Sequence, residues 1–167
     1  KNVIITGTSR GIGFELVHLF ANAGHKVLAL SRNAQPVNNL HFDNINSFAF
    51  DLSKAEDYNK VSAFVKENWN GKVDVLINNV GQYLPGTILE EADDALALQM
   101  QTNVYPAYTL SKFFGKEMRT RKSGYIINIC SIASLNVVKE AASYSVTKVA
   151  LLGLTTILRE ELQSSGV

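Results

Sequence analysis

The sequence predicts a doubly wound α/β domain in which a mainly parallel sheet carries helices on both faces. Short, bulky apolar runs alternate along the chain with longer stretches whose apolar residues recur at helical spacing. Buried parallel strands have such continuous apolar sequences, because both faces of the sheet are covered. A glycine-rich turn follows the first run, and polar residues follow several others, where ligands bind in open α/β sheets. The 167 residues are enough for one domain with a sizeable core.

The alternation gives the bounds of the expected elements. The strands are expected at residues 3–5, 26–30, 47–50, 73–77 and 125–130. The main helices are expected at 14–23, 54–69, 91–100, 101–121 and 143–163, with Asn103 near the start of the fourth. Residues 33–46 contain Pro36 and five asparagines, so we expect a loop with at most one short helical turn. The last strand is expected to be buried, with Ser131 at its carboxyl end.

The composition argues against two classes of partner. The chain has 46% hydrophobic and 19% charged residues, and its formal net charge is +1. We expect neither nucleic acid nor a membrane as a partner, because proteins that bind either usually carry a basic patch or run. No apolar run reaches the roughly 18 residues that span a bilayer, and no signal-peptide pattern opens the chain. The first residue is Lys1 and not Met, so the chain looks like a trimmed copy of something longer.

Cysteine and histidine point to no special chemistry. Cys130 is the single cysteine and cannot form an intramolecular disulfide, so we expect a cytoplasmic protein with this thiol in a packing role. His18, His25 and His41 have no ligand-like spacing and belong to no recognisable nucleophilic triad. We therefore expect no metal.

Residues 6–13, with the sequence Thr-Gly-Thr-Ser-Arg-Gly-Ile-Gly, connect the first strand to the first helix. Glycines let a backbone approach a pyrophosphate closely, and the free N–H groups and dipole of a helix start favour negative charge. This turn is therefore a candidate phosphate site. Gly7, Gly11 and Gly13 do not match the G-x-G-x-x-G dinucleotide fingerprint, so a turn that only reverses the chain stays open as the alternative.

The end of the second strand bears on the choice of nucleotide. A dinucleotide fold that prefers NAD usually has an acid there to bind the ribose hydroxyls, whereas a 2′-phosphate requires cations. This chain has Ser31 and Arg32 at that point, and Arg10 lies in the glycine-rich turn. Two guanidinium groups could bind a 2′-phosphate, so NADP(H) is favoured over NAD(H). Solvated arginines are the alternative, because arginine is mostly exposed.

Two further strand ends carry polar residues. Asp51 could accept a hydrogen bond from an adenine amino group, or Ser53 could simply cap the next helix. Residues 78–81, Asn-Asn-Val-Gly, follow the fourth strand. Asparagine and glycine also serve ordinary turns, so a purely structural role for this segment stays open.

Tyr144 and Lys148 are four residues apart in the last expected helix and share one of its faces. An ammonium group beside a phenol stabilises the phenolate, so this tyrosine could act as a general acid or base near working pH. Ser131, at the preceding strand end, could hold the substrate oxygen. A solvated helix face is the alternative on the spacing alone.

The order and spacing of these motifs resemble the short-chain dehydrogenase/reductase family through the whole chain. The shared positions are Thr6-Gly7-x-x-x-Gly11-x-Gly13, Asp51, Asn78-Asn79-Val80-Gly81, Asn103, Ser131 and Tyr144-x-x-x-Lys148. Each motif is weak alone, and the joint match is specific. The family's turn is similar to T-G-x-x-x-G-x-G, which accounts for the misfit with the older fingerprint. The resemblance implies a Rossmann-type sheet with strand order 3-2-1-4-5.

The resemblance also implies the roles of four residues. Tyr144 would give a proton to a carbonyl oxygen on reduction, or remove it from an alcohol on oxidation. Lys148 would bind the nicotinamide ribose and favour the phenolate. Ser131 would hydrogen-bond the reacting oxygen, and Asn103 would fix a water that extends a proton relay to Lys148. The nicotinamide would supply the hydride.

On the same basis, the cofactor site would extend from the glycine-rich turn to the last helix. Its expected members are Gly7, Ser9, Arg10, Gly11, Ile12, Gly13, Arg32, Asp51, Leu52, Asn79, Gly81, Tyr144 and Lys148. The expected protein is an NADP(H)-dependent oxidoreductase acting on a ketone, aldehyde or secondary alcohol. A homodimer or homotetramer is expected, because family members often pair through the helices at 101–121 and 143–163. A noncatalytic NADP(H) sensor and a scaffold are the alternatives.

Two features depart from the family pattern. Val80 stands where alanine is more usual, a small change in volume. Family members continue past residues 165–167 into a sixth strand, a Pro-Gly turn, a substrate-covering loop and helix, and a seventh strand. We therefore interpret residues 1–167 as a single NAD(P)-binding domain that lacks the usual C-terminal strands and substrate loop, so the substrate stays unidentified.

Overall fold

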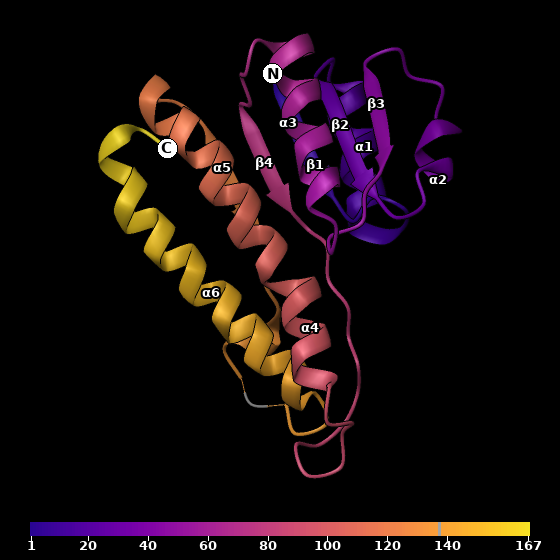
Figure 1. The fold of residues 1–167 in the computed structure, drawn as a ribbon, viewed down its shortest axis with the longest axis vertical. Helices are drawn as coiled ribbons and strands as arrows, with labels where there is room; N and C mark the ends of the chain where they lie inside the picture. Colours follow the sequence, from indigo (N-terminus) through magenta and orange to yellow (C-terminus); the bar gives the residue numbers. More distant parts are fainter. Residues whose placement is uncertain (137) are drawn as a thin grey trace.

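The computed structural model describes residues 1–136 and 138–167. Within them, five strands form one parallel sheet in the order β3-β2-β1-β4-β5 (Figure 1). The strands are β1 (Asn2–Thr6), β2 (Lys26–Ser31), β3 (Ile45–Ala49), β4 (Val75–Asn78) and β5 (Tyr125–Asn128). β1 pairs with β2 on one side and β4 on the other, so the strand order reverses at β1. The predicted fold class and strand order are confirmed.

Helices connect the strands and run along both faces of the sheet. The first three are α1 (Gly11–Asn22), the short α2 (Gln35–Asn38) and α3 (Ala55–Trp69). The others are α4 (Ala95–Asn103), α5 (Tyr105–Arg121) and α6 (Ala142–Leu162), with single 3₁₀ turns η1 (Ile132–Ser134) and η2 (Gln163–Ser165). Figure 1 shows α6 running beside α5, with the start of α6 next to α4.

Two hydrophobic cores lie on the two faces of the sheet. Successive side chains of a strand point to opposite faces, and β1 divides its residues accordingly. Ile4 shares one core with residues of α3 and α5, such as Val61 and Phe114. Ile5 shares the other core with Val17 of α1. The helices therefore cover both faces, as predicted.

The helix bounds differ from the prediction at two functional positions. α1 begins at Gly11 rather than at Phe14, so part of the glycine-rich turn is already helical. Asn103 is the last residue of α4, and the next helix begins two residues later, at Tyr105, instead of at residue 101. The helices separate at Val104, and Pro106 follows within the first turn of α5. Proline lacks an N–H group and fits a first helical turn, so it favours a new helix start here.

β5 is shorter and less buried than predicted. It ends at Asn128 and forms an edge of the sheet, so Cys130 follows the strand instead of lying in its middle. The side chains of Tyr125 and Ile127 are 59% and 42% exposed. The prediction of a buried strand was wrong because an apolar run does not reveal whether a neighbouring element covers it.

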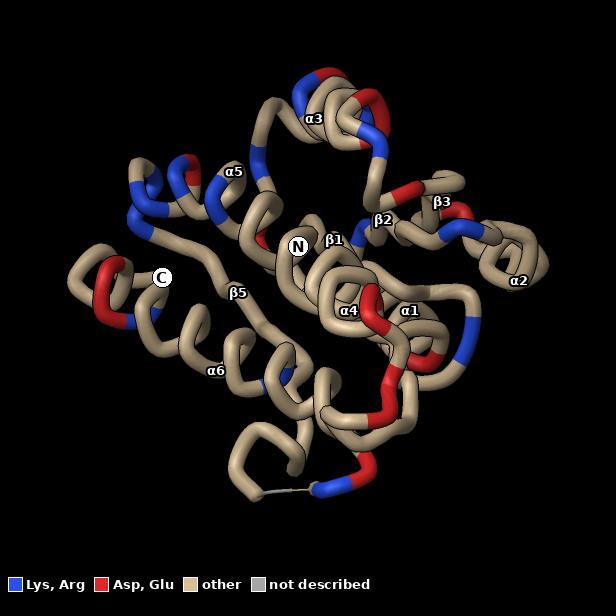
Figure 2. Tube along the Cα trace, turned by 60° about the horizontal axis from the view of Figure 1, so that its bottom comes forward, with Lys and Arg blue, Asp and Glu red and all other residues tan. Residues whose placement is uncertain are grey.

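Charged residues of both signs are spread along the chain, as Figure 2 shows. Basic residues gather toward the end of α5, and acidic residues gather in the connection before α4.

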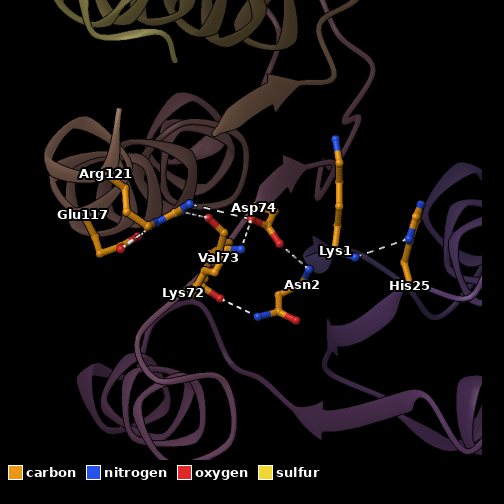
Figure 3. A network of polar contacts seen from close by, with 8 residues as sticks. All are labelled: Lys1, Asn2, His25, Lys72, Val73, Asp74, Glu117 and Arg121. Carbon is orange, nitrogen blue, oxygen red and sulfur yellow. Dashed lines mark hydrogen bonds and ion pairs between the residues drawn. The ribbon is translucent and has the colours of Figure 1, made fainter. Parts of the chain in front are cut away.

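A polar network joins β1, β4 and α5 at the amino ends of the strands (Figure 3). The Asp74 carboxylate accepts the N–H of Asn2 at 2.8 Å and pairs with Lys72 at 3.4 Å and Arg121 at 3.6 Å. Arg121 also pairs with Glu117 at 2.7 Å. Partial burial alone would raise the pKa of Asp74, but the Asn2 N–H and the two cations together bring that pKa below its ordinary value.

The variant Asp74→Asn is expected to lower the free energy of unfolding by about 1–3 kcal/mol at neutral pH, because the Asn2 N–H and two cations lose their carboxylate. The pKa of Asp74 is lower in the folded state than in the unfolded state, where it is about 3.9. Its contribution is therefore present above that unfolded pKa and is lost as the pH falls through the folded one. Urea unfolding of parent and variant should show a difference that shrinks in acid. A difference that does not change with pH would contradict this, and the exposed Asp43, changed to Asn, is the control.

Candidate functional site

The glycine-rich turn lies at the carboxyl end of β1, where the strand order reverses. Gly7 and Gly11 have positive φ angles of 71° and 59°, which glycine adopts without strain. Gly13 faces the backbone of its own turn: a Cβ there would lie 2.3 Å from the carbonyl oxygen of Gly7 and 2.5 Å from Nδ2 of Asn79. The first turn of α1 is therefore packed directly against the loop that precedes it, with no room for a side chain.

The exit turn of β4 is hydrogen-bonded to the glycine-rich turn. Thr6 Oγ1 accepts the N–H groups of Asn79 at 3.0 Å and Val80 at 3.1 Å. Asn79 Nδ2 donates to the carbonyl oxygens of Thr6 at 3.0 Å and Gly7 at 3.2 Å. Residues 78–81 therefore do more than reverse the chain, because they fix the shape of the turn beside them.

A pocket of about 850 Å³ opens at this edge of the sheet. Nine of the predicted cofactor residues line it: Gly7, Ser9, Arg10, Gly11, Arg32, Asp51, Leu52, Asn79 and Gly81. Ile12 and Gly13 of the same turn do not line it, and neither do Tyr144 and Lys148 of α6. Ile12 is 61% exposed, and Gly13 is buried behind the turn. Gly13 can thus affect the pocket only through the backbone that it allows to pack.

Sequence reasoning missed several residues that line this pocket. Asn33, Gln82, Gln101 and Thr102 belong to it and come from three different segments. Gln101 and Thr102 directly precede Asn103, and that adjacency was the only available signal. Gln82 follows the Asn-Asn-Val-Gly segment and could have been found by extending that motif by one residue.

One end of the pocket is suited to an anion. The first turn of α1 has no side-chain cap and no acidic residue, so its N–H groups and the positive end of its dipole stay available. Arg10 and Arg32 both line the pocket and are exposed. Within residues 1–136 and 138–167 neither arginine forms an ion pair. Two cations and a free helix start therefore border the same space.

Asp51 lines the pocket after β3, in a fixed orientation. Its Oδ1 accepts the N–H of Ser53 at 3.0 Å and the Ser53 hydroxyl at 2.7 Å. The bond from the Ser53 N–H is the main cause that lowers the pKa of Asp51 below its ordinary value. Ser53 does not cap α3, because the cap residue is Lys54 and it makes no side-chain bond. The alternative of a simple helix cap is therefore wrong, and the carboxylate remains an acceptor at the pocket wall.

α6 places Lys148 beneath the ring of Tyr144. Lys148 Nζ lies 5.7 Å from the centre of that ring and donates to the carbonyl oxygen of Ile129 at 2.9 Å. Lys148 is only 3% exposed, and this burial lowers its pKa, while the nearby Cys130 acts in the opposite direction. The ring of Tyr144 also meets the edge of the Tyr83 ring, with 5.1 Å between the centres. Lys148 is therefore buried and Tyr144 is half-buried and packed against Tyr83, so the pair predicted from sequence spacing is not a solvated helix face.

Ser131 is the cap residue of η1, the 3₁₀ turn that follows β5. Its Oγ accepts the N–H of Ala133 at 3.2 Å, and Ser134 Oγ accepts the N–H of Ser131 at 3.2 Å. Since the Ser131 oxygen already accepts, its own proton remains for another acceptor. Within the described part of the chain, no hydrogen bond joins Ser131 to Tyr144 or Lys148.

Asn103 is buried and makes three hydrogen bonds to its surroundings. Its Oδ1 accepts the N–H of Gln82 at 2.7 Å, and its Nδ2 donates to the Gln82 carbonyl at 3.0 Å and to Thr147 Oγ1 at 3.0 Å. Thr147 in turn donates to the carbonyl of Tyr144 at 2.8 Å. Asn103 therefore ties the pocket wall to the turn of α6 that carries Tyr144. Its role in holding a water stays a prediction.

Gly81 and Tyr83 connect the pocket to the Tyr144–Lys148 pair. Both line the pocket, and Tyr83 contacts Tyr144 as described above. A Cβ at Gly81 would lie 3.5 Å from Lys148 Nζ and 3.7 Å from Asn103 Oδ1. A long ligand that fills the pocket from the glycine-rich turn would thus end beside Lys148.

The family described as short chain dehydrogenase matches residues 1–167. The chain belongs to this family. The predicted membership is therefore confirmed, and with it the oxidoreductase class that the family represents. The match is continuous and includes the glycine-rich turn, the exit turn of β4 and the Tyr144–Lys148 pair of this short-chain dehydrogenase.

Curated relatives of this short-chain dehydrogenase are moderately similar to it. An uncharacterized oxidoreductase of Staphylococcus aureus is 29% identical, over all of this chain and 74% of the relative. Dehydrogenase/reductase SDR family member 6 of Rattus norvegicus is 31% identical, over all of this chain and 67% of the relative.

Solved structures agree with the fold in detail. A short-chain dehydrogenase from Streptomyces avermitilis has a TM-score of 0.93 at 28% identity, covering 99% of this chain and 62% of that one. ElxO with NADP bound has a TM-score of 0.90 at 30% identity, with coverage of 99% and 69%. 4-Hydroxyisoleucine dehydrogenase complexed with NADH has a TM-score of 0.88 at 26% identity, with coverage of 99% and 71%. The chain thus spans 62% to 71% of the length of these three proteins.

Residues 1–136 and 138–167 contain neither a membrane-spanning helix nor a cluster of metal ligands. None of their helices has the length and apolar character that crossing a membrane requires. No group of three or more His, Cys, Asp or Glu side chains among them could hold a metal ion.

Proposed function

We propose that this chain is the nucleotide-binding and catalytic part of an NADP(H)-dependent oxidoreductase that interconverts a carbonyl compound and an alcohol. The observation that carries the proposal is the position of Lys148, buried beneath the Tyr144 ring and next to Gly81 at the rim of the pocket. The acid–base pair thereby lies beside the part of the pocket wall that Gly81 forms.

The residues present fit a dinucleotide. Gly7 and Gly11 line the pocket without side chains, and α1 begins without a side-chain cap, so a pyrophosphate can approach the first turn of α1 closely. The pocket of about 850 Å³ is large enough for such a ligand. Asp51 lines its wall as an acceptor for an adenine amino group. Two of the similar solved structures hold NADP and NADH, respectively.

When bound, the nicotinamide supplies or accepts the hydride. The Tyr144 hydroxyl gives its proton to the carbonyl oxygen on reduction and takes it back on oxidation. Ser131 donates its free proton to the same oxygen, because its own Oγ is held by the N–H of Ala133. Lys148 keeps protons beyond the one given to the Ile129 carbonyl, and these can reach ribose hydroxyls and stabilise the phenolate. The protein thus contributes orientation and proton transfer.

Oxidation of NADPH by a panel of ketones and aldehydes, followed by the absorbance of the reduced cofactor, tests this function in the full-length protein. Turnover of at least one carbonyl compound is expected. Failure of the whole panel, with NADPH bound, would favour a protein that senses the nucleotide without chemistry.

The preference for NADP(H) rests on Arg10 and Arg32. Both line the pocket, and no described side chain neutralises either of them. The side chain of Ser31, which precedes Arg32, is directed to the carbonyl of Asn33 at 2.8 Å. The position that carries an acid in NAD-preferring folds thus offers no negative charge here.

The variant Arg32→Ala is expected to weaken NADPH binding by about tenfold or more while NADH binding changes little, because a charge-assisted bond to phosphate contributes about 1.5–3 kcal/mol. Fluorescence titration with each nucleotide measures both affinities. Arg159→Ala, on the exposed surface of α6, is the matched control. An equal loss for NADPH and NADH would contradict the assignment of Arg32 to the 2′-phosphate.

We also propose that two copies associate through α5 and α6. Tyr108 and Phe113 on α5 are 52% and 53% exposed, and Ile157 on α6 is 58% exposed. A groove of about 260 Å³ lies between the two helices. Large apolar side chains on adjacent helices are typical of an interface between subunits.

A further inference from the structure

The connection between β4 and α4 lies against the start of α6. Figure 1 shows this connection running away from the sheet to the end of the molecule where α4 and α6 begin. The N–H of Gly86 donates to the carbonyl of Glu140 at 2.9 Å, and the N–H of Ala142 donates to the carbonyl of Gly86 at 3.1 Å. These two bonds form a single parallel bridge centred on Gly86 and Ala141. The residues just before Tyr144 are therefore held by a segment distant in sequence.

Glu91 extends this contact with a charged group. Its carboxylate accepts both the N–H of Ser143, at 3.4 Å, and the Ser143 hydroxyl. Ser143 is 3% exposed, and the cap residue Ala141 gives the helix no side-chain bond. Glu91 therefore supplies from outside the helix what a cap residue normally supplies, and its negative charge faces the positive end of the α6 dipole.

Gly86 makes this arrangement possible by its small size. A Cβ at Gly86 would lie 3.0 Å from the Cβ of Glu91. The backbone of the connection can therefore turn tightly enough for both Glu91 and Gly86 to contact the start of α6.

The neighbouring acids do not share this role. Figure 2 shows several acidic residues close together before α4. Glu90, adjacent to Glu91, is exposed and accepts the hydroxyl of Thr87 at 3.3 Å, within its own segment. The chain thus provides two adjacent glutamates, of which one contacts α6 and the other does not.

The same connection also touches Tyr144 itself. Besides its ring contact with Tyr144, Tyr83 donates its hydroxyl to the carbonyl of Glu140 at 3.2 Å. Tyr144 directly follows Ser143, so the backbone that Glu91 holds also determines where the Tyr144 side chain starts.

We propose that Glu91 is a positioning residue for Tyr144, which it orients by holding the Ser143 N–H and hydroxyl at the first turn of α6. This inference rests on the proposed function, in which Tyr144 transfers the proton.

Two variants of Glu91 and one of Glu90 test the inference. Glu91→Ala removes both acceptors, Glu91→Gln keeps one neutral acceptor, and Glu90→Ala is the matched control. Hydrogen exchange of the Ala142, Ser143 and Ser145 amides reports the first turn of α6 without requiring activity. We expect about tenfold faster exchange there in Glu91→Ala, a smaller effect in Glu91→Gln and none in Glu90→Ala, with exchange in α1 and α3 unchanged.

Kinetics then separate positioning from general destabilisation. We expect kcat to fall by about 10- to 100-fold in Glu91→Ala and less in Glu91→Gln, with the affinity for NADPH unchanged, because a displaced catalytic group loses rate and not cofactor contacts. If Glu91→Ala does not fold, Ser143→Ala removes the hydroxyl partner alone and should give the same pattern at reduced size.

The outcomes of the two arms are distinct. If the amides in the first turn of α6 exchange at the same rate in Glu91→Ala as in Glu90→Ala, the inference is overturned, whatever the kinetics. Loss of NADPH affinity in parallel with kcat would also overturn it, because that pattern indicates damage to the whole site. An absence of turnover in the unsubstituted protein would contradict the proposed function instead, and the exchange arm would still decide whether Glu91 holds the helix start.

Discussion

Replacing Tyr144 with Phe is expected to reduce turnover by about 10²-fold or more while leaving the affinity for NADPH nearly unchanged. The variant keeps the ring that packs against Tyr83 and lies above Lys148, so the local packing is retained. Only the hydroxyl is lost, and with it the proton that the carbonyl oxygen receives. Steady-state turnover and a fluorescence titration with NADPH measure the two quantities separately.

Tyr105→Phe is the matched control for this variant. Tyr105 is 55% exposed at the start of α5 and does not line the pocket. It should lose neither turnover nor cofactor affinity. Turnover of Tyr144→Phe equal to that of the unsubstituted protein would remove Tyr144 from catalysis. It would then favour a nucleotide sensor or a scaffold.

The variant Gly13→Ala is expected to lower the free energy of unfolding by about 3 kcal/mol and to weaken NADPH binding by at least about tenfold. The new Cβ would meet the Gly7 carbonyl carbon at 2.9 Å as well as the closer Gly7 oxygen and Asn79 amide. Two of these atoms are backbone, so relief requires the first turn of α1 to move away from the glycine-rich turn. That movement would also displace the helix start that faces the phosphate.

Gly153→Ala is the matched control, because both glycines are helical. A Cβ at Gly153 would meet nothing within 4 Å, and the residue is exposed on α6. Alanine there should stabilise the protein by about 0.5–1 kcal/mol, since glycine is the poorer helix former. Urea unfolding measures both effects. Equal effects of the two substitutions would show that helix propensity, and not close packing at Gly13, decides the result.

The sequence predicted those features that depend on local pattern. The buried strands have continuous apolar sequences, so their positions could be predicted to within a few residues. The Tyr144–Lys148 pair was predicted because residues four apart share a helix face, and the structure places the two side chains together. Ser131 was placed at a strand end because an apolar run directly precedes it, although the strand stops at Asn128.

Features that depend on contacts between distant segments were beyond the sequence. Asn103 binds Gln82 and Thr147 across 21 and 44 residues, and no spacing rule connects these positions. The side chain of Asn79 is directed into the glycine-rich turn, which its own motif does not reveal. Glu90 and Glu91 are adjacent and identical in type, and only their contacts in the folded chain distinguish their roles.

Burial at the sheet edge was the main error. The run at 125–130 has the composition of a central strand, yet Tyr125 and Ile127 are exposed because β5 is an edge strand and the described elements leave the face that these two side chains share largely uncovered. Composition measures what a strand could bury, whereas burial depends on which elements actually cover it.

Titration of the full-length protein with NADPH and then NADH, followed by nicotinamide fluorescence, tests the central claim most directly. We predict saturable binding of both nucleotides with higher affinity for NADPH, and oxidation of the bound NADPH when a suitable carbonyl compound is added. A folded full-length protein that binds neither nucleotide would contradict the assignment of the pocket and of the chemistry beside it.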